Sequence, residues 1–314
     1  MSCLILHHLA QSAVVEYDYD MKTRADNRLV RLLGALATRE GPNPTSLSGV
    51  KLYRISRPLP RHAAIYEPWI IIIAQGSKRV YFSGDVYIYD ADNYLVTAVP
   101  MPVECETPNA SPQNPILLLA ITVDPLMIGE LLLEMDDESP SPQSVPRGLY
   151  ASPLTQSLKD AAVRLLDCLK SPTDSRVLGP QFVREIVYRV LQGERGEVLR
   201  ALAARDTHFG QISRVLDHLH RNYAKAVDVE SLARQAKMSP SIFYQKFKAV
   251  TTMSPLQYLK SVRLGKARLM MIQDGCTASA AAFAVGYESA PQFSREYKRL
   301  FGVSPGQDAK TMRV

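Results

Sequence analysis

One fifteen-residue pattern occurs twice near the C-terminus and limits what this chain can fold into. Residues 241–255 read SIFYQKFKAVTTMSP, and residues 291–305, fifty positions later, read PQFSREYKRLFGVSP. Both copies carry Phe, an aromatic residue four positions later, then Lys, an aliphatic residue and a closing Ser-Pro. Aromatic residues four positions apart lie on one face of a helix, so each copy predicts an amphipathic helix. The duplication predicts two copies of one structural unit.

Each copy has the flanking signals of a helix-turn-helix unit. The first helix is predicted to begin at Ser239-Pro240, because Ser is a preferred N-cap and Pro suits the first helical position. A shorter predicted helix precedes each copy, VESLARQAKM in the first and TASAAAFAVGY in the second. Ser-Pro-x-Gln follows each copy, at 254–257 and 304–307, and matches a capping box that opens another helix. A short helix, a turn and a helix with a polar outer face form the helix-turn-helix plan.

A predicted helix from Pro255 to about Gln273 joins the two units. It spans roughly 27 Å at 1.5 Å per residue, and successive major grooves on one face of B-DNA are about 34 Å apart. One polypeptide is therefore predicted to place two reading helices in adjacent grooves. Phosphate contacts are predicted for charged residues on or near this helix, with an ordinary solvent-exposed face as the alternative: Lys260, Arg263, Lys266 and Arg268.

The charge distribution places the basic surface at the C-terminus. From Asp206 onward there are 16 Lys and Arg against 8 Asp and Glu, a net +8, whereas residues 1–205 carry 21 against 23, a net −2. A polyanion is therefore expected to bind the C-terminal third. A length of 314 residues favours two domains.

The cysteines and the apolar runs indicate a cytoplasmic protein. The four cysteines are far apart and include no Cys-x-x-Cys pair, which argues against a zinc site and a disulfide framework. The runs WIIIIA (69–74) and ILLLAITV (116–123) are too short to span a bilayer. No basic region precedes the apolar stretch at the N-terminus, so it is not interpreted as a signal peptide. No membrane association is expected.

The N-terminal half is predicted to contain β-strands. VKLYRIS, WIIIIA, RVYF, VYIY, YLVTAV and PILLLAITV lie between residues 50 and 125, separated by turn clusters such as QGS, SGD and DADN. Short strands at this spacing favour a β-barrel or a sandwich. The Pro/Ser-rich stretch ESPSPQSVPRG (138–148) is interpreted as a connection.

A predicted helical pair follows within residues 153–203. Leu158, Ala162, Leu165 and Leu169 share one helix face, and Phe182, Ile186 and Val190 share another. Packing against the strands and a homodimer interface are both open interpretations of these faces.

The C-terminal hundred residues resemble the DNA-binding domain of the AraC/XylS family of bacterial transcription regulators. The resemblance runs through LARQAKMSPSIFYQKFKAVTTMSPLQYLKSVRLGKARLMM and AAAFAVGYESAPQFSREYKRLFGVSP, of which VGYES followed by QFSREYKRLFGVSP is the most specific part. YEPWIIIIAQGSKRV, YIYDADNYLV and VPMPVE resemble the N-terminal domain of one branch of that family. The resemblance covers the chain from about residue 28.

The resemblance implies a two-domain α+β protein. A tail (1–27) precedes a cupin-like β-barrel with a helical pair (28–204), which senses an effector and dimerises. An all-α domain (205–314) with two helix-turn-helix units follows. The implied function is sequence-specific binding of double-stranded promoter or operator DNA by a nucleoid-associated regulator. Activation through RNA polymerase is the commonest mode of action in the family.

The resemblance also assigns residues that contact DNA. Bases are expected to be read by Ser241, Tyr244 and Gln245 in the first unit and by Pro291, Gln292 and Arg295 in the second. Arg295 is the strongest candidate, because a guanidinium can bond both O6 and N7 of guanine; an ion pair with Glu288 or Glu296 is the alternative. Phosphate contacts are expected from Ser239, Lys248, Lys260, Arg263 and Lys298.

The chain departs from the family pattern at two places. Lys237 stands where the family usually has Gly in the first turn, and a non-Gly residue at positive φ costs energy. Ala290-Pro291 opens the second reading helix where polar residues are usual. Neither can donate a side-chain hydrogen bond to a base, so readout in that unit is expected to depend on Gln292 and Arg295.

The implied effector pocket lies in the mouth of the barrel. Its candidate lining residues, for which ordinary packing is the alternative, are His62, Tyr66, Trp69, Tyr81, Tyr87 and Tyr89. A metal-dependent cupin enzyme needs two or three His with a carboxylate, and this segment has one His. No cofactor or catalytic residue is expected. A DNA-repair protein would need a reactive Cys cluster, which the scattered cysteines do not supply.

Overall fold

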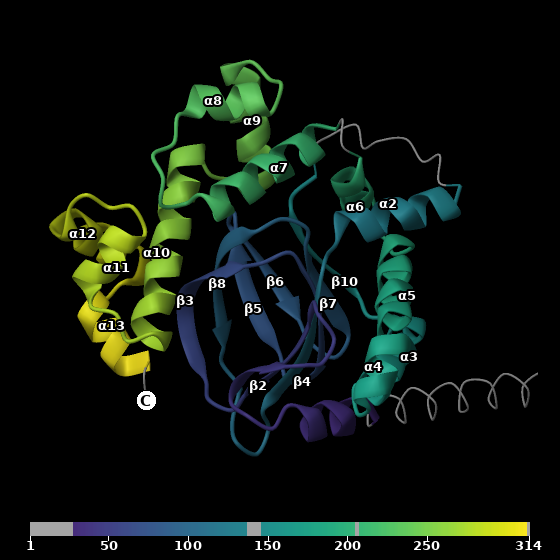
Figure 1. Cartoon of the computed structure of the whole chain (residues 1–314). Coiled ribbons are helices and arrows are strands. Elements are labelled where there is room, and N and C mark those ends of the chain that lie inside the picture. The colour runs from purple at the N-terminus through teal and green to yellow at the C-terminus, as the bar shows by residue number, and fades with distance from the viewer. Residues whose placement is uncertain (1–27, 137–145, 205–206, 313–314) are drawn as a thin grey trace, which may run out of the picture.

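The computed structural model describes residues 28–136, 146–204 and 207–312. The predicted tail 1–27 and most of the predicted connection 138–148 lie outside these residues. Two sheets lie at the centre, one group of helices flanks them on the right in Figure 1, and the C-terminal helices lie above and to the left. The two-domain α+β organisation predicted from the sequence is confirmed.

The strands form two antiparallel sheets instead of the single closed barrel that was expected. One sheet has the strand order β1-β2-β9-β4-β7-β10, and the other has the order β3-β8-β5-β6. A barrel closes only when its edge strands pair with each other, and the described strands pair within their own sheets. The strands are β1 (Gly41–Pro44), β2 (Val50–Ile55), β3 (Leu59–Tyr66), β4 (Trp69–Gln75), β5 (Lys78–Phe82), β6 (Asp85–Tyr89), β7 (Asn93–Thr97), β8 (Met101–Thr107), β9 (Ile116–Thr122) and β10 (Leu149–Pro153).

The two longest apolar runs form the centre of the six-stranded sheet. β4 pairs with β9 over most of its length, with Ile70 opposite Ile121 and Ile72 opposite Leu119. All four of these side chains are at most 1% exposed. Their continuous apolar sequence fits a strand that is covered on both faces.

Two strands of the smaller sheet were not predicted by strand composition. β3 (LPRHAAIY) and β8 (MPVECET) contain Pro, Ala and charged residues, which are depleted in strands. They pair with each other from His62–Cys105 to Tyr66–Met101. This long-range pairing overrides their weak local preference.

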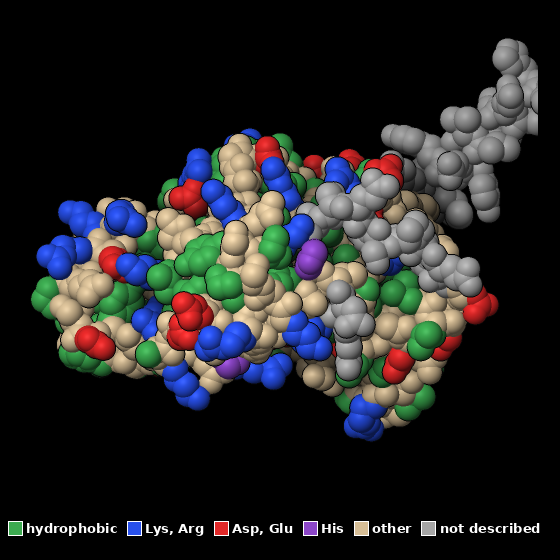
Figure 2. Space-filling view, turned by 90° about the horizontal axis from the view of Figure 1, so that it is seen from above, with side chains coloured by type: hydrophobic (Ala, Val, Ile, Leu, Met, Phe, Trp, Pro, Cys, Tyr) green, Lys and Arg blue, Asp and Glu red, His purple; other side chains and the backbone are tan. Residues whose placement is uncertain are grey.

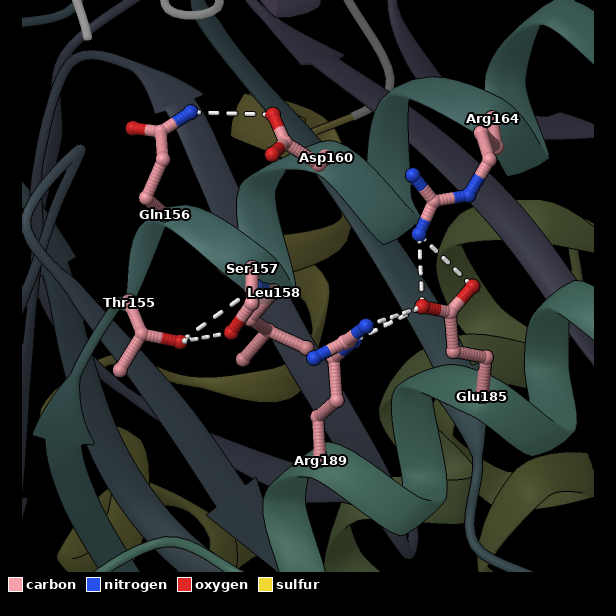
Figure 3. A network of polar contacts seen from close by, with 8 residues as sticks. All are labelled: Thr155, Gln156, Ser157, Leu158, Asp160, Arg164, Glu185 and Arg189. Atoms are coloured by element: carbon pink, nitrogen blue, oxygen red, sulfur yellow. Dashed lines mark hydrogen bonds and ion pairs between the residues drawn. The ribbon is translucent and has the colours of Figure 1, made fainter. Parts of the chain in front are cut away.

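Helices cover the six-stranded sheet on the right in Figure 1. The predicted pair is confirmed as α3 and α5, whose apolar faces are buried, including Leu158, Leu165, Ile186 and Val190. On their polar sides, Arg164 and Arg189 both donate to the Glu185 carboxylate (Figure 3). A further helix covers residues 28–36. The other helices of this half are α2 (Pro125–Glu134), α3 (Gln156–Cys168), α4 (Pro172–Val177), α5 (Gly179–Leu191) and α6 (Glu197–Ala203).

The C-terminal half is helical and contains the two predicted units. The first unit is α8–α9, the second is α11–α12, and α10 joins them. Ser239 caps α9 by accepting from the Ile242 amide, and Ser254 with Gln257 forms the expected capping box of α10. The helices are α7 (His208–Arg221), α8 (Val229–Gln235), α9 (Pro240–Thr251), α10 (Pro255–Gln273), α11 (Ala278–Ala284), α12 (Ala290–Phe301) and α13 (Pro305–Met312).

The two units differ at the backbone positions that need positive φ. In the first unit Lys237 (φ 54°) lies in the turn between α8 and α9, and Thr252 (φ 63°) follows α9. The second unit has Gly286 (φ 88°) and Gly302 (φ 79°) at the equivalent places. Because a Cβ makes this conformation costly by about 1 kcal/mol or more, the first unit carries strain that the second avoids. The strain predicted at Lys237 is thus confirmed by its backbone angle.

Helix α10 packs on the outer face of the four-stranded sheet, beside β3 (Figure 1). Tyr258 Oη donates to Pro100 O at 2.7 Å, and Arg268 Nη1 donates to Ala63 O at 3.2 Å. Lys266 Nζ lies 3.7 Å from Glu67 Oε1. The helix that links the two helix-turn-helix units therefore also contacts the N-terminal half of the chain.

Candidate nucleic-acid interface

The first reading helix, α9, has one buried and one exposed face. Phe243, Phe247 and Val250 are fully buried, and the two Phe rings pack 5.5 Å apart. The predicted base-reading residues are all exposed, as is the predicted phosphate contact at the end of the helix: Ser241, Tyr244, Gln245 and Lys248. The local sequence period thus places every predicted reading residue of this unit in reach of a ligand.

The second reading helix, α12, repeats this arrangement. Phe293 and Tyr297 are fully buried, and the Phe301 ring packs against Tyr297 at a tilt, with ring centroids 4.4 Å apart. The predicted DNA contacts are again exposed: Pro291, Gln292, Arg295 and Lys298. Lys and Arg side chains gather at the left end of the molecule in Figure 2, where α11–α13 lie.

Glu296 organises the polar side of α12. Its carboxylate accepts from Lys260 Nζ and Tyr287 Oη, each at 2.8 Å, and from Gln292 Nε2 at 3.3 Å. Burial alone would raise the pKa of Glu296, but these hydrogen bonds outweigh it and hold the pKa below its usual range. The carboxylate is thus ionised and fully engaged.

Arg295 is not part of this network. Its side chain is exposed and makes no hydrogen bond or ion pair with a residue in the described part of the chain. The alternative considered from the sequence, pairing with Glu288 or Glu296, is not what the structure shows. A guanidinium in this state does not have to break an internal contact before it binds a base or a phosphate.

Arg263 holds three segments of the C-terminal half together. Its guanidinium donates to Tyr223 O at 2.7 Å, Lys225 O at 2.9 Å and Gly286 O at 3.1 Å. These bonds tie α10 to the loop after α7 and to the turn of the second unit. The phosphate contact assigned to Arg263 stays a prediction, whereas its structural contacts could not be found from helical spacing.

The other predicted phosphate contacts divide into engaged and exposed groups. Lys260 is engaged by Glu296, and the Ser239 hydroxyl caps α9. Lys248 and Lys298 lie exposed in the last turns of α9 and α12.

Of the basic residues of α10, Arg268 donates to Asp308 Oδ2 at 2.7 Å, and Asp308 also accepts from Tyr297 Oη at 2.6 Å. Arg268 therefore ties α10 both to α13, through Asp308, and to the sheet, through Ala63 O.

A buried polar chain crosses from the C-terminal half into the sheet. Because Tyr258 Oη donates its proton to Pro100 O, it must accept from His220 Nε2, which lies 2.8 Å away. Burial, with the charge of Lys266, lowers the pKa of His220 from 6.5 to about 4. His220 is therefore neutral at pH 7, with its proton on Nε2.

We expect the folded protein to lose stability as the pH falls below about 6.5, because of His220. The unfolded chain takes up a proton near pH 6.5, whereas the folded chain does so only near pH 4. This stabilisation is complete above pH 6.5 and is lost as the pH falls to about 4. At about pH 5 the loss is on the order of 2 kcal/mol. Urea unfolding of the full chain at about pH 7 and about pH 5 measures it. His220→Gln should show a smaller pH dependence, and an equal one would contradict the assignment.

Three of the six predicted effector-pocket residues lie together between the sheets. Tyr66 Oη and Tyr89 Oη are 2.9 Å apart, and His62 Nε2 lies 3.6 Å from Cys105 Sγ. Burial opposes the Cys105 thiolate, but the hydrogen bond with His62 and the charge of Lys78 outweigh it and lower the pKa of Cys105 to about 7. Cys105 was not singled out from the sequence, because its neighbours arrive through the β3–β8 pairing.

The other three residues lie apart from this cluster. The Trp69 ring packs on Tyr53 with centroids 6.2 Å apart. Tyr81 Oη donates to Glu106 Oε1 at 2.7 Å, and Tyr87 Oη accepts from Arg147 at 3.4 Å. The pocket role of the six residues stays a prediction.

A pocket of about 460 Å³ lies between the two halves of the chain. Strands β3, β5, β6 and β8 line one side, and α10 with the end of α12 lines the other. Its lining is mainly apolar, with Ile65, Phe82, Val103 and Phe301 among its residues, and Arg61 and Glu104 at the polar part. Of the six predicted residues, Tyr81 lines this pocket.

Among the described residues, no helix is long and apolar enough to cross a membrane, and no group of three His, Cys, Asp or Glu side chains is placed to hold a metal. The described chain combines a β-rich N-terminal half with two helix-turn-helix units in its C-terminal half. Comparisons with known proteins agree. Residues 46–198 match the family described as AraC-type transcriptional regulator N-terminus, and residues 232–311 match a helix-turn-helix domain. The chain belongs to the AraC/XylS family.

The relatives are distant. The HTH-type transcriptional activator RhaS of Escherichia fergusonii is 27% identical over 154 residues, which is 41% of this chain and 55% of RhaS. The lactose operon transcription activator of Staphylococcus xylosus is 25% identical over 144 residues, 46% of this chain and 50% of that protein. The chain thus spans about half the length of these two curated relatives.

The fold is similar to that of ToxT from Vibrio cholerae. An apo form of a ToxT variant superposes with a TM-score of 0.59 at 12% identity, covering 87% of this chain and 100% of ToxT. Wild-type ToxT bound to an unsaturated fatty acid gives a TM-score of 0.55 at 12% identity, covering 84% and 95%. At this identity the similarity concerns the fold.

Proposed function

We propose that this protein is a sequence-specific DNA-binding transcription regulator that acts as an activator. The observation that carries the proposal is the duplicated exposed face of α9 and α12, each held by a buried aromatic row. Base edges are read by Ser241, Tyr244 and Gln245 in one groove and by Gln292 and Arg295, beside Pro291, in the next. Lys248 and Lys298 contact phosphates, which fixes the register without reading sequence.

The N-terminal half regulates the DNA-binding half through the α10 contact. Tyr258, Arg268 and Lys266 on α10 all bond to the N-terminal half. A small effector in the adjoining 460 Å³ pocket would change how α10 is held. The apolar lining with Arg61 at its polar part suits an amphipathic molecule, and the ToxT fold that binds an unsaturated fatty acid supports this class of effector.

The helical pair α3–α5 is the proposed homodimer contact. Val177 and Leu178, between these helices, are 62% and 44% exposed, and exposed apolar residues mark interaction surfaces when they cluster. RNA polymerase is the proposed partner at the promoter, in keeping with the activators RhaS and the lactose operon activator. None of these roles involves catalysis.

A binding selection on random double-stranded DNA tests the proposal. The selection uses full-length protein at one fixed, near-physiological salt concentration. It should recover two short sequence blocks about one helical turn apart, because α9 and α12 each read one groove. If selection with and without candidate amphipathic effectors recovers only salt-sensitive binding with no enriched motif, the protein is not a sequence-specific regulator.

A further inference from the structure

The two reading helices can be compared position by position, because they are copies offset by fifty residues. Ser239 is the N-cap of α9, and its hydroxyl accepts from the Ile242 amide at 3.5 Å. Ser289 is the N-cap of α12, and its hydroxyl accepts from the Gln292 amide at 3.3 Å. Ile242 and Gln292 therefore occupy the same place in the two helices, the third residue after the cap.

Ile242 is an exposed apolar residue on the reading side of α9. Its side chain is 40% exposed, whereas the next residue, Phe243, is fully buried. Ile242 and Gln245 are three positions apart, so they lie on one face of the helix. The equivalent Gln292 is one of the proposed base-reading residues of α12, and it too is exposed. A single exposed apolar residue is common on protein surfaces; the position of Ile242 in the repeat, rather than its exposure, indicates that it faces DNA.

The surroundings of this position differ between the two units. Gln292 Nε2 donates to Glu296 Oε1 at 3.3 Å, and so belongs to the polar network of α12. The residue equivalent to Glu296 in α9 is Lys246, and Ile242 has no polar side-chain atom to take part in such a network. An isoleucine placed against a polar base edge removes water from that edge without replacing its hydrogen bonds, which costs free energy. The apolar group that a base pair presents in the major groove is the C5-methyl group of thymine.

We propose that Ile242 is a further specificity-determining residue, whose side chain contacts the C5-methyl group of a thymine in the sequence block bound by α9. The inference rests on the proposed sequence-specific binding of DNA by α9 and α12. Burial of one methyl group against an apolar side chain contributes about four-fold in affinity. The same place in the repeat thus reads an apolar group in the first unit and hydrogen-bonding groups in the second.

Replacement of thymine by deoxyuridine tests the contact, because it removes this methyl group and nothing else. Each thymine of the duplex recovered by selection, on both strands, is replaced one at a time, and binding of the full chain is measured by fluorescence anisotropy at one fixed salt concentration. One replacement, in the block that Arg295→Ala leaves unchanged, should weaken binding about four-fold. Ile242→Ala should abolish that difference, so that it binds the thymine and deoxyuridine duplexes equally, and Ile242→Val should keep part of it.

Two controls separate reading of the methyl group from other effects. Ile242→Ala should keep the melting temperature of the protein, because the side chain is exposed and alanine is the better helix former. Leu269→Ala removes an apolar side chain that is 47% exposed on α10, outside the reading helices, and should bind with the wild-type preference for thymine.

Three results would overturn the inference while leaving a two-block motif, and with it the proposed function, in place. They are a block of α9 without thymine on either strand, deoxyuridine replacements that all leave binding unchanged, and a loss on replacement that persists in Ile242→Ala. Failure to recover any motif would instead contradict the proposed function and the thymine contact together.

Discussion

Replacing Arg295 by alanine is expected to lower affinity for the selected DNA site by roughly ten- to hundred-fold, and to relax one of its two sequence blocks. Arg295 is exposed on α12 and has no internal partner among the described residues. A bidentate contact to guanine contributes about 1–3 kcal/mol of discrimination. Fluorescence anisotropy with the selected duplex and a scrambled duplex, at one fixed salt concentration, measures the ratio of the two affinities.

Lys298→Ala provides the control for this experiment. Lys298 is exposed in the last turn of the same helix, and its proposed contact is a phosphate. Its loss should weaken binding to both duplexes equally and reduce the salt dependence. If Arg295→Ala also weakens both duplexes equally, Arg295 does not read a base.

Replacing Gly286 by alanine is expected to lower the free energy of unfolding by more than about 3 kcal/mol. The backbone at Gly286 has φ 88°, and a Cβ there would lie 2.2 Å from Ala224 O. The carbonyl of Gly286 also accepts from Arg263, so the turn cannot move without breaking that bond. Urea unfolding followed by circular dichroism measures the loss.

Gly302→Ala separates the two causes of this destabilisation. Gly302 has φ 79°, but a Cβ there would meet no atom within 4 Å. It should therefore cost only the conformational part, about 1–2 kcal/mol. Equal losses for the two variants would mean that the contact with Ala224 contributes nothing.

The helix-turn-helix units could be predicted because their signals are local. Ser239 caps α9 and Ser254 caps α10, as expected. The four-residue spacing of Phe243 and Phe247 places both in the core. A helix repeats every 3.6 residues whatever lies around it, so the polar residues of each copy lie on the face opposite the aromatic row. Hence the predicted reading residues of both units lie at the surface.

The N-terminal site was harder to predict because it forms between strands distant in the sequence. His62 meets Cys105 across a β3–β8 pair separated by 43 residues. Tyr81 and Tyr89 were both predicted to line the pocket, but their side chains lie in different surroundings. The hydroxyl of the buried Tyr89 is hydrogen-bonded to that of Tyr66, whereas the Tyr81 hydroxyl donates to Glu106. Successive side chains of a strand point to alternate faces of the sheet, but the sequence of one strand does not indicate which face packs against the other sheet.

The sequence by itself determined the helices of the two helix-turn-helix units and which face of each reading helix is apolar, since capping and helical period depend on residues within a few positions. Only the tertiary structure decided that Arg263 bonds three carbonyls and that Arg268 ties α10 to the sheet. Helical spacing made Arg263 and Arg268 look like phosphate contacts, because a basic residue has the same local signal whether its partner is water, DNA or a carbonyl. Which partner it meets depends on the packing of segments that the local sequence does not encode.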